Sequence, residues 1–328
     1  MINIEDLGEA FVEQLNKFHT YPQPFDEPLD AWLHQSYANV IKRGKQVDWN
    51  KPYFSPSSST DCPRALYHKL KKHKKDKKRL KPHQRRWQGI GTQAGDFIQR
   101  EILLAERHMK KITGEEPRFV MGITDENTPA FEEFIFVQQP IEHNGEVFSL
   151  LGTSDGMLID KETGEKVILE IKTKSDSPSK TKYTNLKSAE QSHINQVICY
   201  SLMYGTNTAI ITYLNVSKKK WFEKDEVLAE FPDLRAFEIN VTPSMQNEVL
   251  DKFAEITKRA RLNDPPLPDL EKWRFSDYQE ATINSLTDAE VAELEGFVSR
   301  YKKSGASMHT KRTVEAAFHD IKRRREKL

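Results

Sequence analysis

Three side chains that could act together lie in the stretch "GTSDGMLIDKETGEKVILEIKTK", residues 152–174. They are Asp155, Glu170 and Lys172, two carboxylates and one ammonium set among residues typical of β-strands. Carboxylate oxygens are the hard ligands that Mg²⁺ and Mn²⁺ prefer. A lysine beside them would offset negative charge on an anionic substrate. Whether the three form a site depends on the elements that position them.

A β-hairpin would bring them together. The segments "VFSLLGTSDGMLI" (147–159) and "KVILEIKTK" (166–174) are rich in apolar and β-branched residues. The intervening "DKETGEK" is typical of a turn. The pattern therefore predicts two antiparallel strands.

The expected register of this hairpin makes the three side chains converge. With the turn centred near residues 162 and 163, Asp155 falls opposite Glu170. Glu170 and Lys172 are two apart and point to one face, whereas Ile171 points to the other. Cross-strand neighbours have Cβ atoms about 5 Å apart, so two carboxylates and an ammonium would meet at one place.

The alternative is a surface hairpin with a solvated ion pair. Two features favour a buried metal site instead. Val167, Ile168, Leu169 and Ile171 make the second strand apolar on both faces, as in a buried central strand. A buried carboxylate pair beside a single lysine is also electrostatically unfavourable unless a cation joins it.

Bulk properties describe a polar chain suited to a soluble, cytoplasmic protein. It has 328 residues, of which 30% are charged, and a mean hydropathy of −0.71. No apolar run approaches the roughly 20 residues of a membrane span, and the start "MINIEDLGEA" does not look like a signal peptide. Only Cys62 and Cys199 are present, so we expect no disulfide framework. The lack of a long apolar run predicts no membrane partner.

The net charge of +1 hides a strongly basic segment, residues 69–86. It holds eleven Lys or Arg against the single Asp76, and a second cluster, "KRRREK", lies at 322–327. Such runs attract polyanions, and Trp87 at the edge favours nucleic acid. A solvated loop is the alternative. The candidate DNA-binding residues are Lys71, Lys72, Lys74, Lys75, Lys77, Lys78, Arg79, Arg85 and Arg86.

The remaining patterns predict a mixed α/β fold. Helical periodicity covers much of the first hundred residues, including a helix over 89–112, and a further helix is expected over 188–205. Strand-like segments dominate from 118 to 174. We expect three regions: a helical region over 1–53, a core over 54–282 that includes the basic insertion, and a helical extension over 283–328.

Four motifs in order resemble the PD-(D/E)XK nuclease superfamily, in particular its RecB-like branch of CRISPR-associated and phage-type exonucleases. They are "SPSSSTDCPRALYHKL" (55–70), "GTSD" (152–155), "EIK" (170–172) and "QVICY" (196–200). The resemblance covers roughly residues 54–280. It implies a restriction-endonuclease-like mixed central β-sheet flanked by helices.

The resemblance also implies roles for these residues. Asp155, Glu170 and the backbone carbonyl of Ile171 would hold Mg²⁺ or Mn²⁺, and Lys172 would act on the attacking water and the phosphate. Gln196 and Tyr200, four apart on one helix face, would support the metal site or hold DNA. Ordinary helix polarity is the alternative explanation for this last pair.

The sequence departs from the family at two places. Where relatives often carry a helix-borne His, "GTQAG" (91–95) has Gly95, and Asp96 is the nearest replacement as a metal ligand, although it could simply face solvent. Iron–sulfur relatives need four cysteines, but only two are present, so we expect no iron–sulfur cluster. Phe275 and Tyr278 stand where further cysteines would lie and are expected to pack in their place.

The resemblance therefore implies a metal-dependent DNA nuclease, with an exonuclease serving recombination, repair or phage-type replication favoured. A recombination or replication protein could be its partner. One alternative is a structure-specific endonuclease acting on junctions or flaps. The other is a catalytically weak DNA-binding module on a nuclease fold.

Overall fold

A computed structural model describes residues 6–217 and 219–327 of the chain. Two compact units emerge, each built from three separate stretches. Unit 1 comprises the residues up to 48, 80–139 and 150–247, and unit 2 comprises 49–79, 140–149 and the residues from 248 on. These units reflect spatial compactness, so they do not test the motif-based division at residues 53 and 282.

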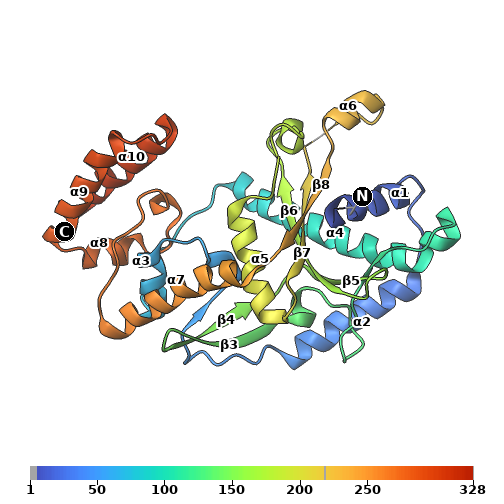
Figure 1. The fold of residues 1–328 in the computed structure, drawn as a ribbon, viewed down its shortest axis with the longest axis horizontal. Helices are drawn as coiled ribbons and strands as arrows, with labels where there is room; N and C mark the ends of the chain where they lie inside the picture. Colours follow the sequence, from blue (N-terminus) through green and yellow to red (C-terminus); the bar gives the residue numbers. More distant parts are fainter. Residues whose placement is uncertain (1–5, 218, 328) are drawn as a thin grey trace. The chain divides into compact units, whose positions relative to one another are not determined.

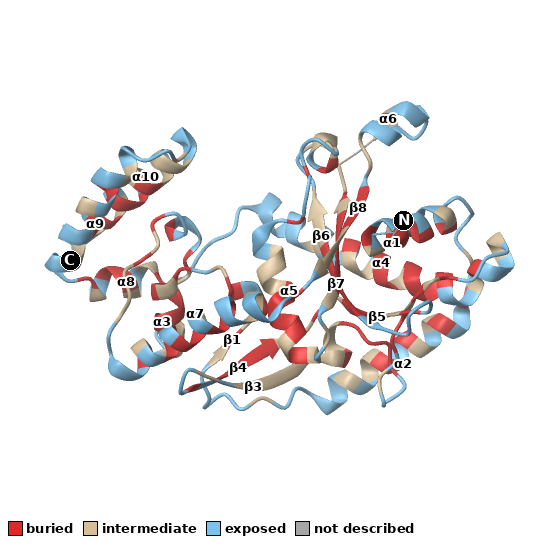
Figure 2. Ribbon diagram, in the orientation of Figure 1, coloured by how far each residue is buried: buried red, intermediate tan, exposed pale blue. Residues whose placement is uncertain are grey.

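Unit 1 is organised around a mixed five-stranded sheet (Figure 1). The β6–β7 pair is parallel, and the other three pairs are antiparallel. The strands, in order across the sheet, are β2 (Phe119–Met121), β5 (Gly156–Asp160), β6 (Lys166–Lys174), β7 (Thr208–Asn215) and β8 (Leu234–Asn240). The central β6 is buried along most of its length, as its two apolar faces predict (Figure 2).

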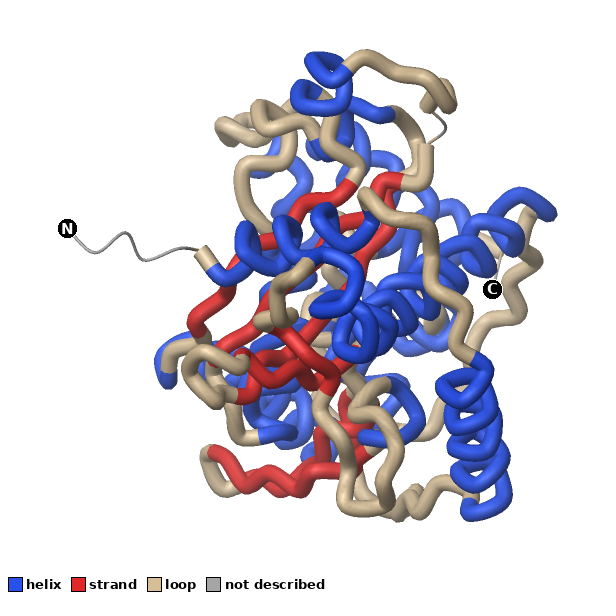
Figure 3. The backbone as a smooth tube through the Cα atoms, turned by 90° about the vertical axis from the view of Figure 1, so that its right-hand side faces the viewer, coloured by secondary structure: helices blue, strands red, loops and turns tan. Residues whose placement is uncertain are grey.

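Helices cover the two faces of this sheet (Figure 3). On one face, α1 contacts β7 and β8, and α4 contacts β2 and β6. Leu169 and Ile171 of β6 belong to the apolar core shared with these helices. On the other face, α5 contacts β6 and β7. The helices of unit 1 are α1 (Leu7–His19), α2 (Glu27–Arg43), α4 (Pro82–Thr113), α5 (Gln191–Tyr204) and α6 (Asp225–Glu230), with short 3₁₀ turns η2 (Glu132–Ile135) and η3 (Pro178–Thr181).

The mixed sheet flanked by helices confirms the predicted fold class, but one predicted strand is wrong. Residues 147–159 do not form a single strand, because β4 (Glu146–Gly152) lies in a three-stranded sheet and β5 lies in the five-stranded one. Between them, the Thr153 hydroxyl donates to the carbonyl of Glu132, and the Ser154 amide donates to the Tyr204 hydroxyl at 3.2 Å. These contacts take the place of sheet pairing and end the strand.

Helix α4 also begins earlier than predicted, at Pro82 rather than residue 89. Proline fits the first turn of a helix because its φ is preset and its missing N–H has no helical partner there. The Gln84 side chain accepts a hydrogen bond of 2.8 Å from the Lys81 amide and closes the cap. The second part of the basic segment is therefore helical.

A buried carboxylate, Asp26, fixes the start of α2 against α4. Asp26 accepts hydrogen bonds from the Leu29 amide at 2.9 Å and from Arg107 Nε at 2.7 Å, and His108 Nε2 lies 2.6 Å away. Burial opposes ionisation, but these partners outweigh it and lower the pKa of Asp26 to about 2.

Unit 2 is mainly helical, with a small sheet in the order β1-β4-β3. Phe54 stacks on Phe253 with ring centroids 4.2 Å apart, and Phe148 packs edge-on against Phe54. A capping box of Thr287 and Glu290 starts α9. Elements wholly or largely in this unit are β1 (Tyr53–Phe54), η1 (Pro56–Ser58), α3 (Pro63–Leu70), β3 (Val137–His143), β4, α7 (Pro243–Leu262), η4 (Trp273–Phe275), α8 (Gln279–Ser285), α9 (Asp288–Lys302) and α10 (Met308–Arg325). Among the residues described, no helix combines the length and apolarity needed to span a bilayer.

Candidate active site

The β5–β6 hairpin brings Asp155 and Glu170 together. Gly156 pairs with Leu169 and Met157 with Ile168, so continuing the register by one residue places Asp155 opposite Glu170. This is the predicted pairing. Asp155 Oδ2 accepts a hydrogen bond of 2.6 Å from the Ile171 amide, which fixes the Asp155 carboxylate against β6.

Lys172 links this hairpin to α5. Its ammonium forms an ion pair with Glu170 Oε1 and donates to Gln196 Oε1 at 3.0 Å. Gln196 in turn donates to the Tyr200 hydroxyl at 2.9 Å. The structure therefore joins Glu170, Lys172, Gln196 and Tyr200 in one polar chain on the α5 face of the sheet.

The surroundings of Asp155 and Glu170 oppose the ionisation of both carboxyl groups. Burial, reinforced by the charge of Asp155, raises the pKa of Glu170 to about 8, and the partnership with Lys172 offsets this only in part. Burial likewise raises the pKa of Asp155, against the opposing effects of the Ile171 amide and Lys172. Only 1% of the Glu170 side chain is exposed, and its Oε2 has no hydrogen-bond partner among the described residues.

The carbonyl of Ile171 also faces this place. In a β-strand the N–H and C=O of one residue point to the same side. Because the Ile171 amide points to Asp155, its carbonyl points there too. The regular pairing of β6 with β5 ends at Leu169 and Gly156, before Ile171 is reached. The carbonyl oxygen is thus directed to the region of the two carboxylates.

A third carboxylate, Glu132, was missed by the sequence analysis. Gln99 of α4 donates both to Glu132 Oε1 at 3.1 Å and to the Asp155 carbonyl at 2.8 Å. Burial raises the pKa of Glu132, and the charges of Asp96 and Asp155 add to the effect. Glu132 has a φ of 46°, a conformation that non-glycine residues rarely adopt. The signal in the sequence was a pair of acidic residues between aromatic ones, "FEEF".

Asp96 lies one helical turn before Gln99 on α4 and is partly exposed. Its Oδ2 accepts a hydrogen bond of 2.9 Å from Gln93, and burial raises its pKa. Its charge acts on Glu132, which places it on the same side of the site. Glu101, further along the helix, instead accepts from Gln23 at 3.0 Å.

A neutral histidine that the sequence analysis missed, His193, lies near the polar chain on α5. His193, Gln196 and Tyr200 share one face of α5 through spacings of three and four residues. His193 Nδ1 lies 2.8 Å from the Tyr213 hydroxyl. Burial, and next the charge of Lys172, lower the pKa of His193 to about 4. Its imidazole is therefore uncharged at neutral pH.

The candidate DNA-binding residues fall into two sets. Lys71, Lys72, Lys74, Lys75, Lys77, Lys78 and Arg79 belong to unit 2, whereas Arg85 and Arg86 are exposed on α4 in unit 1. Within unit 2, Lys71 donates to Asn263 Oδ1 at 2.6 Å, and Lys78 pairs with Asp277 at 2.9 Å. Some of these lysines thus already have protein partners.

The expected packing around Cys62 in unit 2 is half right. Tyr278 is buried and packs with Cys62 and Ala65, and Cys62 Sγ accepts from the Asp269 amide at 3.2 Å. Phe275, however, is 75% exposed and is not part of this buried cluster. The short 3₁₀ turn η4 directs Trp273 inward but leaves Phe275 outside.

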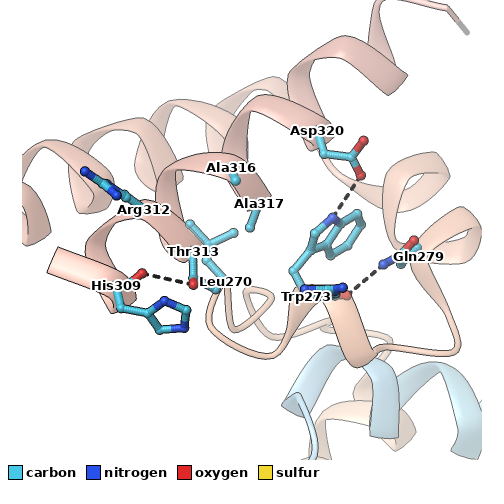
Figure 4. A pocket seen from close by; sticks show the side chains of 10 residues that line it. Leu270, Trp273, Gln279, His309, Arg312, Thr313, Ala316, Ala317 and Asp320 are labelled. Carbon is cyan, nitrogen blue, oxygen red and sulfur yellow. Dashed lines mark hydrogen bonds between the residues drawn. The ribbon is translucent and has the colours of Figure 1, made fainter. Parts of the chain in front are cut away.

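A separate pocket of about 400 Å³ lies against Trp273 (Figure 4). The indole N–H donates to Asp320 Oδ2 at 3.0 Å, and the Gln279 amide donates to the Trp273 carbonyl at 2.7 Å. Ala316 and Ala317 of α10 also line the pocket (Figure 4). These contacts account for Trp273 as a structural residue of unit 2.

Comparison with known proteins gives only distant similarities. No known family matches the sequence, and no curated protein matches it. Among solved structures, SSO0001 is 12% identical, with 80% of this chain and 98% of that chain covered and a TM-score of 0.38. The alkaline exonuclease LHK-Exo from Laribacter hongkongensis is 11% identical (65% and 90% covered, TM-score 0.37). A phage related exonuclease from Haemophilus somnus 129PT is 10% identical (65% and 95% covered, TM-score 0.31). TM-scores this low do not assign an activity to this chain.

Proposed function

We propose that this chain is a metal-dependent deoxyribonuclease that acts as an exonuclease, in recombination, repair or phage-type replication. The observation that carries the proposal is the pair of Asp155 and Glu170, held together in a buried setting with one lysine between them and α5. Such an arrangement is unfavourable by itself, because burial removes both carboxylates from water and their like charges repel each other. It becomes favourable when a cation shares them.

The residues present fit a divalent cation. Glu170 Oε2 is buried without a hydrogen-bond partner among the described residues, so a bound cation would satisfy it. Asp155 and the Ile171 carbonyl would be the other protein ligands of the cation, and Glu132 and Asp96 lie nearby. Among the residues described, no three acidic, His or Cys side chains form a complete cage. Mg²⁺ is commonly held by one or two carboxylates, with water completing its shell.

When bound, Mg²⁺ or Mn²⁺ supplies Lewis-acid stabilisation of the phosphate and lowers the pKa of a bound water. Lys172 is the group of this chain that acts on the substrate. The Lys172 side chain is 24% exposed, so a phosphate that arrives from solvent can contact its ammonium group. Its contacts with Glu170 and Gln196 fix where that charge lies.

Gln196 and Tyr200 are positioning residues in this proposal. Gln196 holds the Lys172 ammonium through its carbonyl oxygen, and the Tyr200 hydroxyl accepts from its amide nitrogen. This fixes the orientation of the amide, because only one of its two ends can accept from an ammonium. The four-motif resemblance to exonucleases supports an exonuclease in particular.

The test is cleavage of end-labelled linear DNA, single- and double-stranded, with Mg²⁺ or Mn²⁺. The wild-type protein should release label from an end, and Asp155→Ala, Glu170→Ala and Lys172→Ala should each reduce the rate by orders of magnitude while remaining folded. Lys166→Ala is the matched control, since Lys166 is exposed at the opposite end of the same strand. Wild-type rates for Lys172→Ala would contradict the proposal. Internal cuts in closed circular DNA would indicate an endonuclease.

A further inference from the structure

A second polar cleft, of about 860 Å³, lies within unit 1 and takes no part in the proposed chemistry. Its walls are residues 173–190, which follow β6 and include η3, together with Trp87 of α4. Trp87 is 54% exposed. A large aromatic side chain open to solvent in a polar cleft is a feature that a ligand could use.

The cleft lies further along β6 from the candidate active site. Side chains two apart on a strand share a face and are about 7 Å apart along it. Glu170, Lys172 and Lys174 therefore follow one another on the α5 face of β6, and Lys174 lines the cleft. A polyanion with one phosphate at Lys172 would place its neighbouring unit here.

The lining has the chemistry of a nucleotide site. Lys174 forms an ion pair with Glu190, and Lys180 lies 3.4 Å from Asp176. These carboxylates orient the two ammonium groups and moderate their charge. Phosphate attraction alone would therefore be modest here, and the aromatic ring becomes the main contact. Hydroxyl and amide groups of Ser179, Thr184 and Asn185 complete the wall.

The Trp87 ring packs against a neighbouring ring on its own helix. His83, one turn earlier on α4, packs edge-on against it, with centroids 5.1 Å apart and an interplanar angle of 77°. This contact restricts the indole and so reduces the side-chain freedom that is lost when a flat group stacks on it. Base stacking on aromatic rings is the common contact of proteins with single strands, and it tolerates any base.

We propose that this cleft binds unpaired nucleotides of single-stranded DNA next to the cleavage site, with one base stacked on Trp87. The inference rests on the proposed nuclease function for the choice of DNA. It commits to a single strand because a base inside a duplex already has both faces stacked and cannot offer one to Trp87. The cleft thus makes the enzyme selective for unpaired ends.

The test is the affinity for a fluorescent oligothymidine and for a duplex of equal length, measured by anisotropy in EDTA so that nothing is cleaved. Trp87→Ala should weaken single-strand binding about 5- to 150-fold, the range implied by the strength of base–aromatic stacking, and Trp87→Phe should restore most of it. Duplex affinity should change less than about twofold, and the salt dependence should stay the same, because the ring contacts no phosphate.

Trp221→Ala is the matched control, since Trp221 is 93% exposed in the same unit and does not line the cleft. Equal single-strand affinity for Trp87→Ala and wild type, or equal losses on both DNAs, would overturn the inference. Because binding is measured without metal, it is separate from the cleavage test. If Trp87→Ala loses single-strand affinity as expected but the wild type cleaves no DNA, the proposed nuclease function is wrong and the single-strand-binding cleft stands.

Discussion

Replacing Glu170 with Gln should make the metal-free protein more stable at alkaline pH and change its stability little at acid pH. Burial and Asp155 raise the pKa of Glu170 from 4.5 to about 8. The folded protein therefore binds this proton more tightly than the unfolded chain. The resulting stability is complete below about pH 4.5 and is lost as pH rises through about 8.

The size of this effect follows from the shift. Each pKa unit corresponds to about 1.4 kcal/mol, so the wild-type free energy of unfolding should fall by up to about 5 kcal/mol across this window. Asp155 is coupled to Glu170 and shares part of the change. The Gln side chain of Glu170→Gln cannot ionise. The free energy of unfolding of the variant should therefore lack this fall with pH.

The assay is urea denaturation in EDTA at about pH 5, 7 and 8.5 for the wild type and Glu170→Gln, analysed by linear extrapolation. The exposed Glu165→Gln, in the turn of the same hairpin, is the control for general charge effects. Mn²⁺ added at the highest pH should raise the free energy of unfolding of the wild type and leave that of the variant unchanged. A difference between the two proteins that stays constant from pH 5 to 8.5 would refute the buried-charge reasoning.

Three further predictions concern other parts of the molecule. Asp26→Asn should destabilise the protein by about 2 kcal/mol at pH 7, since the partners of this carboxylate lower its pKa to about 2; the difference should vanish as pH falls from about 4 to 2, measured by urea denaturation. Purified protein should lack absorbance near roughly 400 nm, and Cys62→Ser should stay active, because two cysteines cannot hold a four-thiolate cluster; stoichiometric iron that tracks with activity would contradict this. Replacing the exposed Lys72, Lys74 and Lys77 with Ala should flatten the salt dependence of duplex affinity by up to about 3 units, and an unchanged slope would indicate a merely solvated segment.

The geometry of the central hairpin could be predicted from sequence because its determinants are local. The turn residues fix the centre of the hairpin, and the period of two then fixes which side chains meet. The start of α7 is equally local: Thr242 directly precedes Pro243, and its hydroxyl accepts from the Met245 amide at 3.3 Å.

Features that depend on distant contacts could not be predicted. The strand over 147–159 has a continuous β pattern, and nothing in that pattern says that its two halves belong to different sheets. Glu132 joins the site through Gln99, the Thr153 hydroxyl and the Ser154 carbonyl, all of them distant in the sequence. The exposure of Phe275 was missed because an aromatic residue was assumed to pack wherever a cysteine would lie.

The discontinuity of the two units limits how the molecule can be divided in the laboratory. The chain passes between them five times, at residues 48, 79, 139, 149 and 247. No single cut therefore separates the unit that contains Asp155 and Glu170 from the other. Stopping the chain after residue 247 would keep every stretch of unit 1 but would interrupt α7 and leave residues 49–79 and 140–149 without the third stretch of their own unit. A minimal fragment that carries Asp155 and Glu170 would need both of these insertions replaced by linkers as well as a new carboxyl terminus.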